Sequence, residues 1–191
     1  MLVVGLGNPG SEFERTRHNL GAETVAVLAE RLGRTLRSEK GTRSVVAQAD
    51  VGERRLVLAV PQTYMNESGM AVVALVRRFR LPSTDRLVVV HDELDLPSGR
   101  VKVKVGGGTA GNNGLKSVHA HLHDPGYTRV RIGIGKPPGR TPGADYVLKR
   151  PARAEREALD VAIQVAADAV EVIIAEGPDA AMGRFNTDGA P

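Results

Sequence analysis

Runs of apolar residues predict the strands of this chain. Residues 87–90 form a continuous apolar run rich in valine, which is typical of a central strand buried on both faces. In residues 101–105 valine alternates with lysine, and this predicts a strand with one buried and one basic face. Further strands are predicted over residues 2–5, 130–134, 45–51 and 55–60, the last two joined by Gly52-Glu53, a dipeptide that favours a tight hairpin turn.

Apolar residues that recur near the helical period of 3.6 predict the helices. Leucine and valine positions between residues 18 and 32 follow this period, and Gly33 stands where a helix takes its left-handed cap. Residues 136–145 contain three prolines and two glycines, so we expect them to be irregular. Further helices are predicted over residues 69–79, over residues 154–176 and in a short stretch that ends near His123.

The order of these elements predicts the fold class. Strands and helices interleave, which indicates an α/β fold, and the hairpin makes the sheet mixed. A length of 191 residues favours one compact domain over residues 1–191, with helices flanking the sheet. The C-terminal helix, at about residues 152–176, is expected to be part of that domain.

Composition excludes several kinds of chemistry. The chain has no cysteine, which removes disulfides, cysteine-bound zinc and every thiol nucleophile. Its first residues, MLVVGLGNPG, have neither the basic lead nor the long apolar run of a signal peptide, so we expect a cytoplasmic protein. The motifs GxxxxGK[ST] and GxSxG are also missing, which argues against a P-loop nucleotide triphosphatase and an α/β-hydrolase.

Positive charge is concentrated in the main body of the chain. Residues 1–150 hold 23 Lys and Arg against 14 Asp and Glu, whereas residues 151–191 hold 3 against 8. Arginine accounts for 20 of the 26 basic residues, and its planar guanidinium suits phosphate groups, so a polyanionic partner is one explanation. A genome that favours arginine codons is the other. Aromatic residues make up only 3%, which argues against a base-stacking platform.

The segment Gly5-Leu6-Gly7-Asn8-Pro9-Gly10 has the GxGxxG spacing of a dinucleotide site and follows a predicted strand. Its context argues against that interpretation. Residues 8–17 are polar and lack a helical period, and the predicted helix starts only near residue 18, whereas the helix of a dinucleotide fold starts within the glycine motif.

Candidate catalytic groups stand at strand ends and in loops. Asp92 follows the buried run 87–90 by two residues, and His18 opens the first predicted helix. A histidine beside a carboxylate can activate water, and neighbouring amides can stabilise an oxyanion, so we expect these groups to meet in one crevice outside the sheet. Asn8 and Asn113 also have a structural alternative as turn residues, Asn66 as a helix cap and Asp92 as the cap of a turn. The amides are Asn8, Asn66, Asn112 and Asn113.

The other histidines are expected to be structural. His119, His121 and His123 share helical spacing, but no carboxylate of the HExxH type accompanies them, so we predict no metal site. They fit better as solvated groups near a helix C-terminus, where imidazole is favoured. His91 is expected to point to the face of the sheet opposite Asp92.

Five sequence blocks make a resemblance specific: VVGLGNPG, TRHNLG, PQTYMNESG, HDELDLPSG and GGG followed by NNGLKS. In this order they closely resemble the bacterial peptidyl-tRNA hydrolase family, and RVRIGIGKP and the C-terminal helix extend the likeness across nearly the whole chain. The resemblance implies a compact α/β monomer with a twisted mixed sheet, no cofactor and no membrane partner. It also implies peptidyl-tRNA as substrate, hydrolysed at the ester between the peptide and the ribose of the 3′ adenosine.

The resemblance also assigns residues. His18 matches the catalytic histidine, Asp92 the aspartate that orients it, and Asn8 the asparagine that separates N-blocked from free aminoacyl-tRNA. Lys104 and Arg131 match contacts to the terminal phosphate of the tRNA. Substrate-binding positions match Phe13, Tyr64, Met65, Asn66 and Asn113.

The phosphate contacts agree with the strand pattern, because basic residues alternate with apolar ones at Lys102, Lys104, Arg129 and Arg131. The alternative is that these four side chains only keep an exposed sheet face solvated. Three positions depart from the family pattern: Phe13 stands where tyrosine is usual, and Thr109 and Asn112 replace two histidines of the glycine-rich loop.

Two other functions remain as alternatives. A non-catalytic RNA-binding or splicing-type relative of the same fold would keep the basic face without needing His18 or Asp92. A nicotinamide oxidoreductase would need Gly5, Gly7 and Gly10 but not the amides. Release of tRNA from N-acetyl-aminoacyl-tRNA by the purified protein separates all three.

Overall fold

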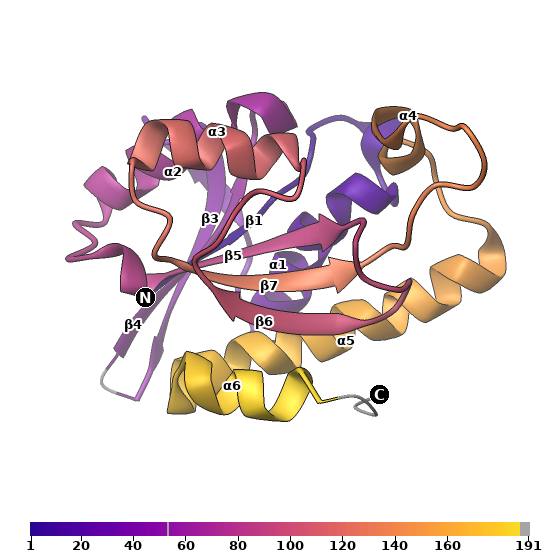
Figure 1. The fold of residues 1–191 in the computed structure, drawn as a ribbon. Helices are drawn as coiled ribbons and strands as arrows, with labels where there is room; N and C mark the ends of the chain where they lie inside the picture. Colours follow the sequence, from indigo (N-terminus) through magenta and orange to yellow (C-terminus); the bar gives the residue numbers. More distant parts are fainter. Residues whose placement is uncertain (53, 188–191) are drawn as a thin grey trace.

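The computed structural model describes residues 1–52 and 54–187, and within them seven strands form one mixed sheet (Figure 1). The strands are β1 Leu2–Gly5, β2 Arg37–Glu39, β3 Ser44–Val51, β4 Arg54–Pro61, β5 Leu87–Glu93, β6 Val101–Val105 and β7 Thr128–Gly133. Their order in the sheet is β2-β3-β4-β1-β5-β7-β6. The inner strands β4, β1, β5 and β7 run parallel, and the outer strands β2, β3 and β6 pair antiparallel.

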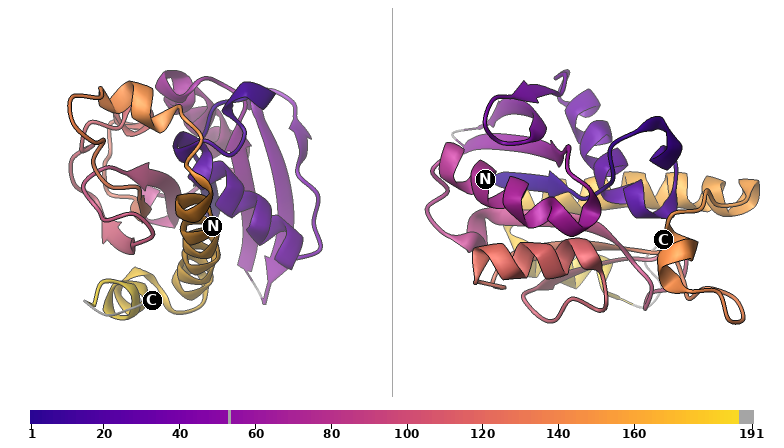
Figure 2. Two further views of the ribbon diagram at one scale, coloured as in Figure 1. Left: turned by 90° about the vertical axis from the view of Figure 1, so that its right-hand side faces the viewer. Right: turned by 90° about the horizontal axis from the view of Figure 1, so that it is seen from above.

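Helices cover both faces of the sheet. They are α1 Leu20–Arg31, α2 Ser68–Arg78, α3 Asn113–Leu122, α4 Gly143–Val147, α5 Arg153–Glu176 and α6 Pro178–Phe185. α1 and α5 pack together on one face, while α2 and α3 pack together on the other (Figures 1 and 2). α6 packs on α5 and the edge strand β6, and α4 lies beyond the end of β7 at the upper right of Figure 1.

Each face of the sheet has its own apolar core. In β5 the residues Val88 and Val90 belong to the core under α1 and α5, and Leu87 and Val89 belong to the core under α2 and α3. All four have 0% exposure. The continuous apolar run therefore has the cause predicted for it, a central strand that is covered on both sides.

The predicted α/β class and mixed sheet are confirmed, and so are the main strands and helices. The strands predicted to form a hairpin, β3 and β4, pair antiparallel, although Glu53 in their turn lies outside the described residues. The prediction that residues 136–145 are irregular is wrong at its end, because α4 begins at Gly143, directly after Pro142.

Two further elements were not predicted. β2 has only three residues and lies at the sheet edge, so it carries little apolar pattern. α6 begins at Pro178, just after the long helix predicted over residues 154–176. Proline is well suited to the first position of a helix, because its missing N–H would have no partner there, so a new helix starts where the long one stops.

The start of α1 touches the backbone of the sheet directly. A Cβ on Gly21 would lie 2.2 Å from the Val90 carbonyl oxygen and 2.8 Å from the Leu6 nitrogen. A Cβ on Gly5 would lie 2.1 Å from the carbonyl oxygen of Gly21. The Ala22 N–H donates to the Leu6 oxygen at 3.0 Å. The glycines around the GxGxxG segment therefore let a helix approach closely.

We predict that Gly21→Ala destabilises the fold by about 1 to 3 kcal/mol, because the new methyl group meets rigid backbone. Gly183→Ala in α6 is the control, since a Cβ there would meet no neighbouring atom within 4 Å, and we expect it to stabilise by about 0.5 kcal/mol. Urea unfolding of both variants measures the difference. Equal midpoints for Gly21→Ala and the parent protein would contradict the close contact.

Candidate active site

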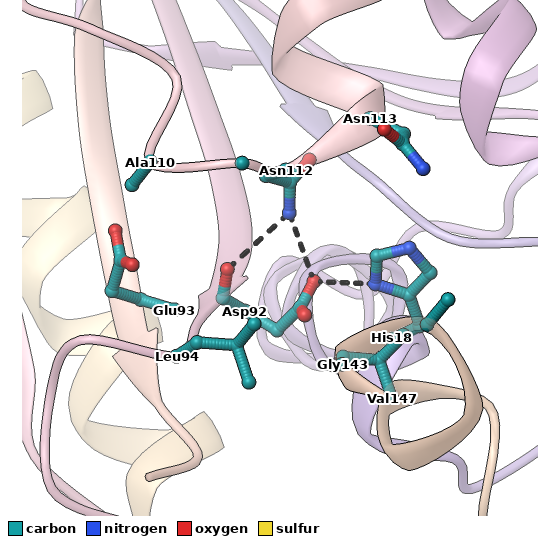
Figure 3. A pocket seen from close by; sticks show the side chains of 11 residues that line it. His18, Asp92, Glu93, Leu94, Ala110, Asn112, Asn113, Gly143 and Val147 are labelled. Atoms are coloured by element: carbon teal, nitrogen blue, oxygen red, sulfur yellow. Dashed lines mark hydrogen bonds and ion pairs between the residues drawn. The ribbon is translucent and has the colours of Figure 1, made fainter. Parts of the chain in front are cut away.

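A histidine and an aspartate meet at the end of the central strand. His18 lies in a short 3-10 turn, Arg17–Asn19, that leads into α1, and Asp92 is the penultimate residue of β5. The His18 Nδ1 and the Asp92 Oδ1 are 2.9 Å apart (Figure 3). His18 is 8% exposed and Asp92 is 3% exposed, so water screens this pair poorly.

Burial and the carboxylate act on His18 in opposite directions. Burial alone would lower the pKa of the imidazole, because it penalises the charged form. The negative charge of Asp92 and its hydrogen bond outweigh that effect, so the pKa of His18 lies above the usual value of 6.5. With Nδ1 bonded to Asp92, the other ring nitrogen, Nε2, is the one left to act on a bound substrate.

Asn8 is held in a fixed orientation just after the end of β1. Its backbone N–H donates to the Asn19 Oδ1 and its carbonyl oxygen accepts from the Asn19 Nδ2, both at 2.9 Å. Its side-chain Oδ1 accepts from the Met65 N–H at 2.7 Å. Because that N–H requires an oxygen, the Nδ2 of Asn8 is directed elsewhere and serves as a donor.

Two adjoining cavities lie beside His18 and share His18, Asn113, Ala144 and Val147 in their walls. The larger has a volume of about 340 Å³, and the smaller, of about 190 Å³, extends along Asp92 toward the glycine-rich loop. The larger is also lined by predicted site residues: Asn8, Phe13, Tyr64, Met65 and Asn66. The structure thus brings eight of the ten predicted site residues together, from β5, α3 and the loops and turns that follow β1 and β4.

Aromatic and apolar side chains form the outer wall of the larger cavity. The rings of Phe13 and Tyr64 meet edge to face, with centroids 6.3 Å apart. Tyr64 is 56% exposed and Leu148 is 41% exposed, which is a large exposure for apolar side chains. Met65 is buried in the same wall, with Gly114 leaving the space that its sulfur occupies.

The wall formed by α4 is anchored at the residue before His18. The Arg17 guanidinium pairs with Glu155 of α5, with Nε at 2.7 Å and Nη2 at 2.5 Å from its carboxylate oxygens. Its Nη1 donates to the carbonyl oxygens of Tyr146 and Lys149. The guanidinium also lies 4.1 Å from the centre of the Tyr146 ring. One buried arginine therefore connects α4 and α5 to the turn that carries His18.

Lys104 and Arg131, the other two predicted site residues, lie on β6 and β7 outside the linings of both cavities. The antiparallel register places Lys102 opposite Arg131 and Lys104 opposite Arg129, so all four side chains share one face of the sheet. The Arg131 Nε donates to the Glu93 Oε2 at 3.1 Å. Glu93 lines the smaller cavity, so Arg131 contacts a residue of the cleft wall without lining the cleft itself.

Arg129 differs from the expected solvated basic residue. It is only 2% exposed, and its Nη1 donates to the Gly108 carbonyl oxygen at 2.7 Å. Its Nη2 donates to the carbonyl oxygen of Gly106. Arg129 therefore supports the glycine-rich loop from below, and burial holds the pKa of its guanidinium below the usual value. The alternation of charges in β7 could not distinguish this role from surface charge.

Asn112 contacts Asp92, although the family resemblance gives it no role there. Its Nδ2 lies 3.3 Å from the Asp92 Oδ1 and 3.4 Å from the Asp92 carbonyl oxygen (Figure 3). Its Oδ1 accepts from the Leu115 N–H at 3.1 Å and so caps α3. An asparagine just before a predicted helix indicates a cap, but nothing in the sequence indicates the second contact.

The remaining histidines do not gather around a ligand. His91 is fully buried, and its Nδ1 lies 2.7 Å from the carbonyl oxygen of Asp92. His119 packs edge to face on Tyr127, and the His121 Nδ1 contacts the Ser117 oxygen at 2.8 Å. Within residues 1–52 and 54–187, no group of three or more His, Asp or Glu side chains has a metal-binding arrangement.

The arrangement is that of an α/β protein whose cleft can activate water and bind a carbonyl group. A profile of the peptidyl-tRNA hydrolase family matches residues 2–191. The chain is 50% identical to "Peptidyl-tRNA hydrolase" of Nocardia farcinica over 97% of its own length and 95% of that protein. It is 44% identical to the protein of the same name of Rhodococcus erythropolis, over 97% of both chains.

A solved structure gives the same result. The crystal structure of peptidyl-tRNA hydrolase from Acinetobacter baumannii superposes with a TM-score of 0.91 at 35% identity, and the match covers 97% of this chain and 94% of that one. This chain therefore belongs to the peptidyl-tRNA hydrolase family.

Proposed function

We propose that this chain exerts the peptidyl-tRNA hydrolase activity of its family through water activated by His18, without a covalent intermediate. The observation that carries the proposal is the 2.9 Å contact of His18 with Asp92 at the wall of a cleft. A protonated Nδ1 directed at the carboxylate makes Nε2 the basic nitrogen. The substrate is the ester between the peptide and the 3′ ribose of tRNA.

The hydrolysis is proposed to proceed in two steps. Nε2 of His18 accepts a proton from water while the water oxygen bonds to the ester carbonyl carbon, and Asp92 stabilises the imidazolium that forms. The ester bond to the ribose oxygen then breaks, and the imidazolium returns its proton to that oxygen. The products are a peptide with a free carboxylate and a tRNA with a free hydroxyl.

Asn8 is proposed to bind the carbonyl part of the substrate. Its Oδ1 is engaged by the Met65 N–H, so its Nδ2 can donate to a carbonyl oxygen and to the negative charge that develops there. A substrate with a free ammonium in place of a peptide bond would bring an unpaired charge into this cleft. Asn113 and Asn66 line the same cavity and extend the polar part of its wall.

The tRNA is proposed to lie across β6 and β7, with Lys104 and Arg131 at its terminal phosphate. These side chains share one face of the sheet, and Arg131 on that face contacts Glu93, which lines the cleft. The cleft is built from one chain, which supports a monomer. Of the helices in the described part of the chain, none is long and apolar enough to cross a bilayer. We propose the cytoplasm, where tRNA is used, as its location.

We predict that His18→Ala abolishes turnover while substrate binding changes by less than about tenfold, because the base is lost and the cavity walls remain. Asp92→Asn should slow hydrolysis less severely, since the imidazole stays in place. In the parent protein kcat/KM should rise with pH through a pKa above 6.5, because only neutral His18 accepts a proton. His123→Asn, at an exposed helix end, is the control. Near-normal turnover in His18→Ala would refute the mechanism, whereas absence of turnover in the parent protein would revive the non-catalytic alternative.

We predict a large preference for N-acetyl-aminoacyl-tRNA over free aminoacyl-tRNA, and Asn8→Asp tests its source. This variant keeps an oxygen for the Met65 N–H but replaces the donor with a carboxylate that attracts an ammonium group. Its preference for the blocked substrate should therefore shrink, with lower kcat on that substrate. The measurement is kcat/KM on both substrates for the parent protein and the variant. An unchanged ratio of the two kcat/KM values would show that Asn8 does not recognise the peptide bond.

We predict that Lys104→Ala combined with Arg131→Gln weakens the binding of tRNA substrates. On a plot of log affinity against log salt concentration, the slope should become shallower by the equivalent of about two phosphate contacts. Glutamine at 131 keeps a donor for Glu93, which is 2% exposed. Arg34→Ala with Arg37→Ala removes equal charge from another exposed region and serves as control. A minimal substrate without the terminal phosphate should be hydrolysed equally by all three proteins. Equal impairment on both substrates would assign the pair to the cleft and not to phosphate.

A further inference from the structure

We propose that Asn112 is a positioning residue that fixes the Asp92 carboxylate for His18. The proposal rests on the proposed function, because it concerns how the histidine is kept basic and oriented. The family's usual pattern has histidine at this position, so the resemblance assigns no such contact to Asn112. It also accounts for one of the two changes in the glycine-rich loop.

The orientation of the Asn112 amide is fixed by its helix cap. Its Oδ1 accepts from the Leu115 N–H at 3.1 Å, and its backbone oxygen accepts from the Lys116 N–H at 3.0 Å. Turning the amide over would place its NH₂ group against the Leu115 N–H and its oxygen against a carboxylate. The cap therefore directs Nδ2 toward Asp92.

Asp92 receives two donors on one oxygen. The His18 Nδ1 lies 2.9 Å from Oδ1 and the Asn112 Nδ2 lies 3.3 Å from the same atom. The donors come from two separate elements, one from the turn before α1 and one from the start of α3 (Figure 3). Rotation of the carboxylate would break both contacts, so the orientation of the histidine ring depends on α3 as well as on α1.

The amide also moderates the charge that His18 experiences. A hydrogen bond to a carboxylate oxygen stabilises its negative charge, so the carboxylate attracts a proton on its other partner less strongly. Asparagine does not titrate, so it makes this contribution at every pH. Removing the donor should leave Asp92 a stronger partner for the imidazolium and move the pKa of His18 further upward.

The other charged groups near this pair already have partners. Glu93, which lines the same cavity, receives the Arg131 Nε at 3.1 Å. Arg17, next to His18, pairs with Glu155 of α5. α4 contributes Gly143, Ala144 and Val147 to the cavity wall, and none of these side chains titrates. Asp92 is thus the charged group in direct contact with His18, Asn112 is a second side-chain donor to its carboxylate, and His91 contacts only the Asp92 backbone oxygen.

Asn112→Asp tests the proposal with an almost unchanged shape. The new carboxyl group can still accept from the Leu115 N–H, so α3 keeps its cap, and once it ionises it places a second negative charge beside Asp92 where the amide donated a hydrogen bond. We expect the kcat/KM profile to move upward by about one pH unit, with a loss that approaches about tenfold at pH values below the pKa of His18 and recovers at higher pH. KM for N-acetyl-aminoacyl-tRNA should change by less than about twofold, since the Asn112 amide faces Asp92 and does not line the larger cavity.

Asn112→Ser separates the cap from the contact with Asp92. Serine caps helices well, but its hydroxyl is too short to reach the carboxylate. We expect a smaller upward shift and a loss of about threefold in kcat at pH 7. Thr109→Ala changes the same loop without a side-chain contact to Asp92, and it should keep the parent profile. Thermal unfolding of all three variants reports the cap separately.

Profiles of Asn112→Asp and Asn112→Ser that coincide with the parent profile would overturn the proposal and leave Asn112 as a helix cap alone. A shift of either profile to lower pH would overturn it as well. His18→Ala distinguishes this failure from failure of the proposed mechanism. If that variant is inactive while the Asn112 profiles do not move, the histidine mechanism stands and only the role of Asn112 is lost.

Discussion

The contact between the first turn of α1 and the ends of β1 and β5 decides where the catalytic groups lie. Gly21 allows the helix to touch the Val90 carbonyl, and the Leu6 N–H donates to that same oxygen at 3.0 Å. Asp92 lies two residues beyond Val90, and His18 lies three residues before Gly21. Backbone held this tightly leaves little freedom for the distance between the two side chains. A site on rigid elements keeps its geometry more accurately than a site on loops.

The opposing effects of burial and charge follow from that placement. His18 and Asp92 lie where water screens little, so burial disfavours the imidazolium and the carboxylate favours it. The carboxylate is the stronger influence, which makes His18 a better base than a buried histidine alone. The cleft walls are fixed through the same turn, because Arg17 ties α4 and α5 to the residue next to His18. Base and substrate wall therefore cannot shift independently.

The sequence predicts those features that a local pattern encodes. Continuous or alternating valine runs predict β5 and β6, and the resemblance of ordered motifs selects His18, Asp92 and Asn8 before any coordinates. Features that depend on tertiary contacts could not be predicted in this way. Arg129 and Arg131 alternate alike in β7, yet only the first is buried beneath the glycine-rich loop.

Short elements and residues with two contacts could not be predicted from the sequence either, because they too depend on tertiary contacts. α4 has five residues directly after a proline-rich segment, too few to show a helical period. Asn112 looks like an ordinary cap, and its second contact arises only because the sheet brings β5 next to the start of α3. Arg17, which contacts α4, and Asp92, the second partner of Asn112, are both distant from these residues in the sequence.

The central claim is that Asp92 reverses the effect of burial on His18. An NMR titration of the His18 ring nitrogens measures this directly, with the parent protein and Asp92→Asn compared. The account predicts a pKa above 6.5 in the parent, with the proton of the neutral ring on Nδ1. In Asp92→Asn only burial should remain, and the pKa should fall below 6.5. A parent pKa below 6.5, or one that Asp92→Asn leaves unchanged, would contradict the account.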